Sequence, residues 1–388
     1  MSKKNLVSRK SQVSQALKNK IVKKVDDNLL KIAVMPMADD GCSHYRINKP
    51  YKMLEEMGLA YVKFFKPTEI EQQDFADHLH LVDLVVCRQY HSKAILGTID
   101  KYFKGVRVLL DLDDDLFNID PYNEAYGAYG TREVKHNNEW LWKDGLNMDI
   151  STNKKEVDLL KKFLKRADIV SVSTPRLKEA LSKYNDNIIV NYNSIDKRDW
   201  LVRDFVKKED EIRIGWTGGA SHYKDWLTIQ EDLLKVMKDF PQVKLVIGGT
   251  VFDGVFKDID PSRIEKYDWV SPSAHGFRTA LMNLDIAIVP LEDSTFNSNK
   301  SCIKFYEFSS LKVPTICSNV PPYSDEVPIE LLFDKLYDKI IPLIKSKELR
   351  DKVGNITYNW IMKNRDLKRV TEDLYNNICD KLTDLNTK

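Results

Sequence analysis

Short apolar runs alternate with amphipathic stretches along the first half of the chain. Runs with the length and composition of buried strands occupy residues 30–35, 60–65, 82–87, 106–111, 169–172 and 188–191. Apolar residues at helical spacing between these runs predict helices over 47–57, after His91, over 154–165 and after Thr174-Pro175. Strands that alternate with helices predict an α/β protein with a parallel, doubly wound sheet.

The same alternation begins again after a charged stretch at residues 200–211. The second set of predicted strands is 212–216, 243–248, 286–290 and 314–318, and the predicted helices are 225–240, 276–283, one that begins at Ser301, 329–345 and 347–382. The pattern therefore predicts a second domain of the same class. We expect a basic arm over 1–28, a first domain over 29–205, a second domain over 206–354 and a C-terminal helical segment over 355–388.

Residues 117–153 interrupt this rhythm with prolines, glycines and aromatic residues that follow no regular period. We interpret them as a long excursion over the face of the first domain, because long loops in compact domains are often functional. A packed irregular insert is the alternative.

The stretch from Asn297 to Pro314 connects two predicted strands through a helix, with Ser301 as its expected N-cap. A parallel crossover puts the helix N-terminus at the carboxyl edge of the sheet, where anions bind. Lys300, Lys304 and Glu307 share one face of this otherwise apolar helix. Two ammonium groups suit a diphosphate, and a carboxylate one turn further suits sugar hydroxyls. A Lys304–Glu307 ion pair on an ordinary helix surface is the alternative.

A glycine-rich loop follows the first strand of the second domain. Thr217, Gly218 and Gly219 permit close backbone approach to a ligand, and Ser221 is an expected helix cap. The loop predicts a second anion site at the same sheet edge, and two such sites fit a nucleotide diphosphate. His222 either contacts the sugar or phosphate or hydrogen-bonds the loop.

Three consecutive carboxylates, Asp113, Asp114 and Asp115, follow the fourth strand of the first domain. They cannot all be buried as charges without partners, and their place at a strand's carboxyl end suggests a site. The cluster binds a metal, serves as a general base or hydrogen-bonds an acceptor's hydroxyls. An exposed turn rich in aspartate is the alternative.

The loop over residues 39–46 follows the first strand and therefore reaches the same edge. Tyr45 and Arg46 stand at the entrance to a helix and suit an anionic or sugar ligand. The alternative is an arginine paired with one of the aspartates.

Composition narrows the class of protein. The chain has 388 residues and a net charge of +2, which argues against a strongly basic nucleic-acid binder overall. The basic arm over 1–28 either contacts a membrane surface or nucleic acid or is a frayed terminus. No apolar run has the length of a membrane span or the form of a signal peptide, and the five cysteines show no metal-ligand spacing. These features predict a cytoplasmic protein with reduced cysteines.

Five motifs in this order resemble a known family. They are Tyr45-Arg-Ile-x-x-Pro50, Asp111-Leu-Asp-Asp-Asp-Leu-Phe117, Ala167-Asp-Ile-Val-Ser-Val-Ser-Thr-Pro175, Ile214-Gly-Trp-Thr-Gly218 and Phe296-Asn-x-x-Lys-Ser-x-x-Lys-Phe-x-Glu307 with Val313-Pro314. The chain resembles nucleotide-sugar glycosyltransferases of GT-B architecture, in the retaining group labelled family 4 or "glycosyl transferases group 1". It is similar to a branch common in phages and bacterial surface-polysaccharide clusters.

The resemblance implies two Rossmann-like domains facing across a cleft, with the donor on the second domain and the acceptor on the first. It implies no metal and no cofactor besides the co-substrate, and a final helix that crosses back to the first domain. Glu307 matches the second glutamate of the family's Glu-x7-Glu pattern, which holds the donor ribose, whereas Asn299 takes the place of the first. The family's basic pair for the diphosphate is matched by Lys300, Lys304 or Lys224.

The sequence thus predicts transfer of a sugar from a nucleotide diphosphate donor to a hydroxyl of a glycan, lipid or protein. The expected catalytic residues are Asp113 and Asp114, and the expected acceptor-binding residues are Tyr45, Arg46 and Asp115. The expected donor-binding residues are Thr217, Gly218, Gly219, His222, Lys224, Asn299, Lys300, Ser301, Lys304 and Glu307. Three alternatives remain: a modified DNA base as acceptor, a metal-dependent transferase that uses Asp113 and Asp115, and a non-catalytic nucleotide-binding protein.

Overall fold

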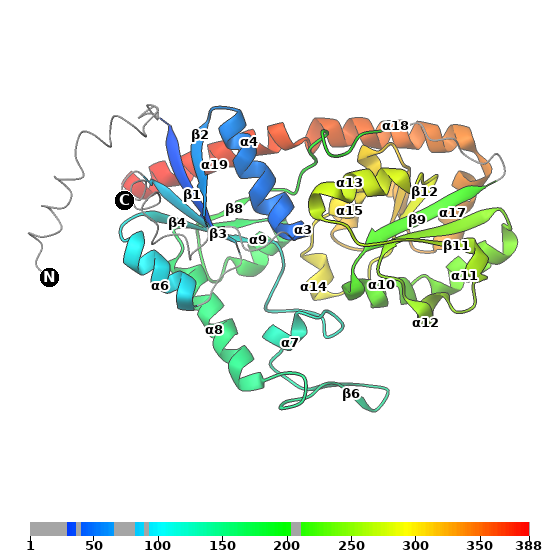
Figure 1. The fold of residues 1–388 in the computed structure, drawn as a ribbon, viewed down its shortest axis with the longest axis horizontal. Coiled ribbons are helices and arrows are strands. Elements are labelled where there is room, and N and C mark those ends of the chain that lie inside the picture. Colours follow the sequence, from blue (N-terminus) through cyan, green and yellow to red (C-terminus); the bar gives the residue numbers. More distant parts are fainter. Residues whose placement is uncertain (1–28, 36–39, 66–81, 89–92, 203–210, 388) are drawn as a thin grey trace, which may run out of the picture.

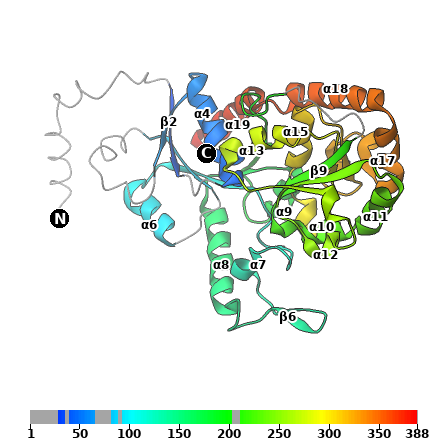
Figure 2. The same ribbon diagram turned by 45° about the vertical axis from the view of Figure 1, so that its right-hand side comes forward.

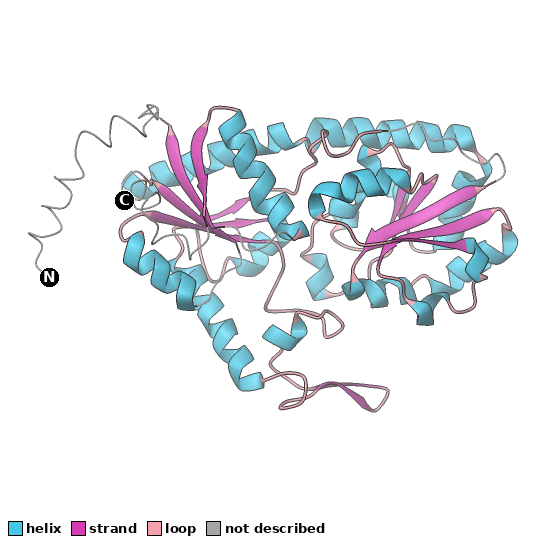
Figure 3. Cartoon of the chain, in the orientation of Figure 1, coloured by secondary structure: helices cyan, strands magenta, loops and turns pink. Residues whose placement is uncertain are grey.

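Two sheets, each with helices on both faces, stand side by side and are joined along one side by long C-terminal helices (Figure 1). The computed structural model describes residues 29–35, 40–65, 82–88, 93–202 and 211–387. The predicted arm over 1–28 and the predicted boundary between residues 205 and 206 lie outside these ranges. The α/β class with two parallel-sheet domains is confirmed (Figure 3).

The first sheet has six parallel strands in the order β2-β1-β3-β4-β7-β8. Its strands are β1 (Leu30–Met35), β2 (Ala60–Phe64), β3 (Leu84–Arg88), β4 (Arg107–Leu112), β7 (Ile169–Val172) and β8 (Ile188–Val190). The helical segments of this domain are α3 (Gly41–Ser43), the π-turn η1 (His44–Asn48), α4 (Lys49–Glu56), α6 (Lys93–Tyr102), α7 (Tyr126–Tyr129), α8 (Ile150–Arg166) and α9 (Pro175–Leu181). β3 and β7 are buried throughout, as strands covered on both faces must be.

The second sheet repeats this design in the order β11-β10-β9-β12-β13-β14, again with every pair parallel. Its strands are β9 (Ile212–Gly218), β10 (Val243–Gly249), β11 (Ile264–Tyr267), β12 (Ile286–Val289), β13 (Thr315–Ser318) and β14 (Leu332–Phe333). Its helical segments are η4 (Ala220–His222), α10 (Tyr223–Leu227), α11 (Gln230–Asp239), α12 (Asp253–Phe256), η5 (Pro261–Arg263), α13 (Pro272–Leu281), α14 (Thr295–Ser298), α15 (Ile303–Ser310), α16 (Tyr323–Glu326), η6 (Ile329–Leu331) and α17 (Leu336–Lys345).

The two edge strands of this sheet were not predicted. β11 is half exposed and has two adjacent charged residues, Glu265 and Lys266, among its four positions, and β14 has two residues. The predicted helices over 225–240 and 329–345 are each interrupted, so those predictions were wrong in their continuity.

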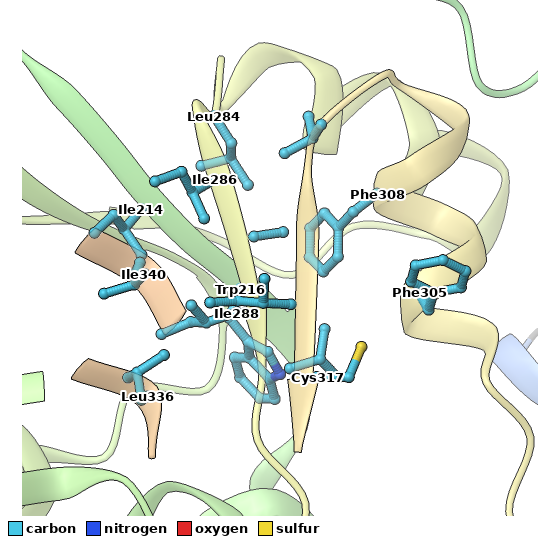
Figure 4. Packing of buried hydrophobic residues seen from close by; sticks show 14 of the residues in the cluster. Ile214, Trp216, Leu284, Ile286, Ile288, Phe305, Phe308, Cys317, Leu336 and Ile340 are labelled. Atoms are coloured by element: carbon cyan, nitrogen blue, oxygen red, sulfur yellow. The ribbon is translucent and has the colours of Figure 1, made fainter. Parts of the chain in front are cut away.

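Helix α15 is held by the core of the second domain. Phe308 of this helix lies beside the strands that carry Ile288 and Cys317 (Figure 4), and Phe305 packs against Trp360 and belongs to the same core cluster as Trp216. The side chains of Phe305, Phe308, Trp216 and Ile288 are fully buried. The buried helix that the sequence predicted is therefore present, and its position relative to the sheet is fixed by packing.

The insert at residues 117–153 projects away from the first sheet (Figures 1 and 2). It contains α7 and the antiparallel hairpin of β5 (Val134–His136) and β6 (Glu139–Trp142), and it leads into α8. Tyr126 and Met148 of the insert are buried in the core cluster of the first domain, so this part is packed, as in the alternative interpretation, whereas the hairpin extends away from the sheet. Its base, near Asp120 and Tyr122, contacts the second domain through Lys224 and Tyr223.

Two helices end the chain in place of the single one predicted over 347–382. α18 (Lys347–Asn364) packs on α15 and α17, and α19 (Leu367–Thr387) packs on α4 and β8 of the first domain. The chain passes between the domains twice, once after β8 and once between α18 and α19. These two segments are hydrogen-bonded to each other, because the Ile195 N–H donates to the Arg365 carbonyl at 2.8 Å and the Leu367 N–H donates to the Ile195 carbonyl at 2.9 Å. The two connections between the domains thus lie against each other.

Candidate functional site

The loops at the carboxyl edges of the two sheets meet between the domains. In the second sheet, β9 and β12 are neighbours, so the glycine-rich loop after β9 and the loop before α15 lie together. Helix α15 begins at Ile303 with Cys302 as N-cap and no capping side chain, so the expected cap at Ser301 was wrong. Ser301 Oγ instead accepts a hydrogen bond from Asn193 Nδ2 of the first domain, at 2.7 Å.

The glycine-rich loop holds a cation directly after β9. The Lys304 ammonium donates to the backbone carbonyl of Thr217 at 2.8 Å and lies over the Trp216 ring at 5.2 Å. A Cβ on Gly218 would come within 3.1 Å of this ammonium and within 2.3 Å of the Trp216 ring, so glycine makes the room. Burial lowers the pKa of Lys304, so the site favours a ligand that restores its charge.

The predicted capping role of Ser221 is not observed. The residue lies within η4, and the following helix α10 has His222 at its N-cap without a side-chain bond. The Thr217 hydroxyl is fully buried, and it has no hydrogen-bond partner among the described residues.

Arg278 of α13 is a second cation of this site, and the sequence predicted no role for it. Its guanidinium is 6% exposed and donates to the Asp268 carbonyl at 3.1 Å and to His275 Nδ1 at 3.0 Å. The guanidinium fits beside β10 because residue 248 is glycine. A Cβ at this position would lie 2.4 Å from the guanidinium. No carboxylate among the described residues pairs with it. The predicted helix over 276–283 includes Arg278, but no local pattern in the sequence indicated that its side chain is buried against Gly248.

Glu307 lies one turn into α15 beside these cations and is 4% exposed. Its Oε1 accepts a hydrogen bond from the Tyr45 hydroxyl of the first domain at 2.7 Å, and His275 Nε2 lies 3.3 Å from the same oxygen. Burial alone would raise the pKa of Glu307, but His275, Lys304 and Tyr45 outweigh it and hold the pKa at about 2. The carboxylate is therefore ionised at neutral pH, and it belongs to the domain interface, unlike the surface ion pair of the alternative interpretation.

His222 forms part of the frame of the glycine-rich loop. Its Nδ1 lies 2.6 Å from Asp225 Oδ2, and the other oxygen of Asp225 accepts from the Glu292 backbone N–H at 2.8 Å. Burial, together with the charges of Lys304 and Lys300, lowers the pKa of His222 to about 4. The ring is therefore neutral at neutral pH, with Nδ1–H on Asp225 and Nε2 left as an acceptor.

Lys224 and Lys300 differ in how fully their charges are paired. Lys224 lies 3.1 Å from Glu292 and 3.6 Å from Asp120, and its ammonium lies over the Tyr122 ring. Lys300 lies over the Phe296 ring at 4.6 Å, and within the described part of the chain no hydrogen bond or ion pair engages its ammonium. Lys300 is therefore available to a ligand, whereas Lys224 joins the insert of the first domain to the second domain.

The three aspartates after β4 have separate environments. Asp115 is buried and accepts from the Phe117 backbone, from Asn118 Nδ2 and from Asn299 Nδ2 of the second domain. Asp113 accepts one long bond of 3.4 Å from Asn193. The Asp114 carboxylate has no hydrogen-bond partner among the described residues.

Asp114 is also the aspartate with a displaced titration. Partial burial and the neighbouring charge of Asp113 raise its pKa to about 6, while Lys300 and Arg88 act in the opposite direction. Lys300 of the second domain thus affects the pKa of Asp114 in the first domain. Among the described residues, no group of three or more His, Cys, Asp or Glu side chains is arranged to hold a metal ion.

Arg46 is completely buried in an ion pair with Asp111, with donor–acceptor distances of 3.0 and 2.6 Å. It also donates to the Asn191 carbonyl and to Asn193 Oδ1. An arginine paired with an aspartate was the alternative interpretation of this loop, and it is the arrangement observed. With its donors engaged inside the first domain, Arg46 anchors the turn that carries Tyr45.

No protein-family model matches the sequence, and no curated protein matches it. Solved structures do match. A glycosyltransferase from Rickettsia africae superposes with a TM-score of 0.60 at 13% identity, over 92% of this chain and 99% of that chain. The catalytic domain of starch synthase IV from Arabidopsis thaliana gives 0.58 at 9% identity, over 92% and 99%.

The chain has the GT-B fold. A Listeria monocytogenes protein assigned as a UDP-N-acetylglucosamine 2-epimerase is also similar, with a TM-score of 0.51 at 11% identity over 92% of this chain and 97% of that chain. At such identities the likeness concerns the fold, and a fold hosts more than one chemistry. The choice between chemistries therefore rests on the side chains between the domains. In the part of the chain that the structure describes, no helix is both long and apolar enough to cross a membrane.

Proposed function

We propose that the chain is a glycosyltransferase that moves a sugar from a nucleoside diphosphate sugar to a hydroxyl acceptor. The observation that carries this proposal is a pair of cations, the half-buried Lys304 and the buried Arg278, held beside the buried carboxylate Glu307. Neither cation has a carboxylate hydrogen-bonded to it among the described residues. Buried charges need a counter-charge, and a diphosphate supplies one.

The cations also suit the charge change of the proposed reaction. As the bond between the sugar and the diphosphate breaks, negative charge grows on the leaving diphosphate. Lys304, Arg278 and Lys300 are fixed before the reaction, and the N-terminus of α15 lies with them. Preorganised positive groups of this kind stabilise a leaving anion without having to reorganise.

The rest of the donor has matching groups on either side of the cations. We assign the ribose hydroxyls to Glu307, in agreement with the resemblance found in the sequence. We assign the nucleobase to Trp269, which is 64% exposed and lies against the loop glycines 219 and 249. The absence of Cβ atoms there leaves one face of the ring supported by backbone and the other face open to stack on a base.

Asp114 is the group that we assign to the acceptor hydroxyl. It lies in the first domain, has no hydrogen-bond partner among the described residues, and has a pKa of about 6. A carboxylate with a pKa near the working pH is suited to orient a hydroxyl and accept its proton. Asp113 beside it raises that pKa and has a supporting role.

We infer a metal-independent and retaining reaction from the resemblance, with no cofactor besides the sugar nucleotide, and a cytoplasmic location from the cysteines and the apolar pattern of the sequence. A glycan, lipid or protein is the acceptor class, and a modified DNA base is the alternative. A nucleotide-sugar epimerase is a second candidate, because the Listeria protein with that assignment shares the fold. Both candidates bind a nucleoside diphosphate sugar, so binding tests what they have in common and products separate them.

Calorimetric titration with UDP, GDP, ADP, CDP and dTDP, each in EDTA and in excess Mg²⁺, tests the proposal. We expect one nucleotide to bind with a dissociation constant that is unchanged by EDTA. Binding that appears only with Mg²⁺ favours the metal-dependent alternative. Absence of binding to every nucleotide contradicts the proposed function.

A further inference from the structure

We propose that Tyr45 is a positioning residue of the donor site, although it belongs to the acceptor domain, and that it does not contact the acceptor. Together with His275 it clamps one oxygen of Glu307 and leaves the other oxygen for the ribose. This inference rests on the proposed function. Tyr45 belongs to the first domain and His275 to the second, so the donor site is complete only when the two domains are in contact.

The two oxygens of Glu307 are used unequally. Oε1 accepts from the Tyr45 hydroxyl at 2.7 Å and faces His275 Nε2 at 3.3 Å. Oε2 has no hydrogen-bond partner among the described residues, and it is not among the buried atoms that lack one. A carboxylate held at one oxygen therefore presents the other to solvent or to a ligand hydroxyl.

The proton on His275 is fixed by its second neighbour. Arg278 Nη2 lies 3.0 Å from His275 Nδ1, and a guanidinium can only donate. In the neutral ring, Nδ1 is then the acceptor and Nε2 carries the proton toward Glu307. The cation proposed for the diphosphate and the carboxylate proposed for the ribose are thus joined through one imidazole.

Tyr45 reaches across the interface because of the shape of its own turn. Residues His44 to Asn48 form a π-turn in which the Lys49 backbone N–H bonds to the His44 carbonyl, five residues back. Pro50 has no N–H to give to Arg46, and this break in the normal ladder is compatible with the wider turn. Arg46 locks the turn to Asp111, while Tyr45 points outward and packs against the core of the second domain.

The test is binding of the tightest ribonucleoside diphosphate from the panel, with its 2′,3′-dideoxy form as a second probe. Tyr45→Phe should weaken binding of the ribonucleotide about 10-fold, the size of one hydrogen bond to a charged group. It should change binding of the dideoxy form by less than about twofold, because that ligand cannot use the clamped carboxylate. His275→Gln, whose amide can replace the Nε2 donor, should retain more affinity than His275→Ala.

Tyr337→Phe is the matched control. Its hydroxyl also donates to a carboxylate at 2.7 Å, that of Asp239, but it lies on α17 at the far end of the second domain (Figure 1). This variant should bind both probes as the wild type does. Melting temperatures of all variants show whether each is folded.

The outcomes separate the two proposals. If the wild type binds no nucleotide, both the proposed function and this inference fail. If the wild type binds and Glu307→Gln weakens binding, but Tyr45→Phe binds both probes as the wild type does, only the inference fails. The same holds if Tyr45→Phe weakens both probes equally, because the effect then does not pass through the ribose.

Discussion

Asn299 of the second domain donates a hydrogen bond from Nδ2 to the Asp115 carboxylate of the first domain, at 2.8 Å. Both side chains are buried. The backbone carbonyl of Asn299 also accepts a hydrogen bond from the Thr174 hydroxyl of the first domain, at 2.9 Å. The family resemblance places at position 299 the first glutamate of Glu-x7-Glu, which contacts the donor sugar. In this chain the Nδ2 of Asn299 ties the second domain to the first, so this donor is already engaged within the protein.

Asn299→Asp should loosen the contact between the domains. The new carboxylate would face the buried Asp115 carboxylate, and two like charges at hydrogen-bond distance repel each other. We expect a larger radius of gyration by small-angle X-ray scattering and a lower melting temperature. Asn118→Asp is the control, because Asn118 also bonds Asp115 at 2.8 Å but lies within the first domain. Equal expansion of both variants would refute a special role for Asn299.

Lys304→Met should lower the affinity for the nucleoside diphosphate by roughly 10- to 100-fold, the size of one charge-assisted hydrogen bond lost from a buried site. Lys224→Met removes the same charge, but that ammonium already pairs with Glu292 and Asp120. It should change affinity by less than about threefold, because two carboxylates already neutralise this half-buried ammonium. Calorimetry compares the two variants. A larger loss for Lys224→Met would assign the diphosphate to Lys224 and contradict its assignment to Lys304.

The rate of donor consumption should fall as the pH drops through about 6, because the role proposed for Asp114 requires its ionised form. Lys300→Gln removes a charge that lowers this pKa, so the acid limb should move to higher pH. Asp114→Asn should reduce the rate and remove the limb, while the affinity for the donor stays close to that of the wild type. A limb that is unchanged in Asp114→Asn would assign the titration to another group.

Glu307 should contribute to stability in a pH-dependent way. Its pKa in the folded state is about 2, below the ordinary value of 4.5, so the contribution is present above pH 4.5 and is lost as the pH falls toward 2. Between pH 6 and pH 3 the wild type should lose roughly 2 kcal/mol more than Glu307→Gln in urea unfolding. Equal pH dependence of the two proteins would show that this carboxylate is not held in its ionised form.

The sequence was sufficient for most of the sheets because buried parallel strands are continuous apolar runs. β1 and β7 have the predicted bounds, and the polar face of α15 carries Lys304 and Glu307 as expected. Edge strand β11 was missed because its four residues are half exposed. His275 and Arg278 lie on α13, and their approach to Glu307 and Gly248 joins distant segments in a way that no local pattern indicates.

Contacts between distant segments were beyond the sequence. Tyr45 and Glu307 are 262 positions apart, and no local pattern indicates that a turn in one domain clamps a carboxylate in the other. Arg46 could be placed at the sheet edge, but its burial against Asp111 depends on how β4, β7 and β8 close around it. The expected cap at Ser301 failed for the same reason, since Asn193 of the other domain takes that hydroxyl.

Incubation of the purified protein with a panel of nucleoside diphosphate sugars tests the central claim most directly. The released nucleoside diphosphate and the fate of the sugar are followed by chromatography, with Lys304→Met and Asp114→Asn as controls. The account predicts slow release of the diphosphate from one sugar nucleotide by the wild type, faster when an acceptor is added and much slower in both variants. Conversion of the sugar nucleotide into its epimer, or tight binding with no consumption of any donor, would contradict the claim.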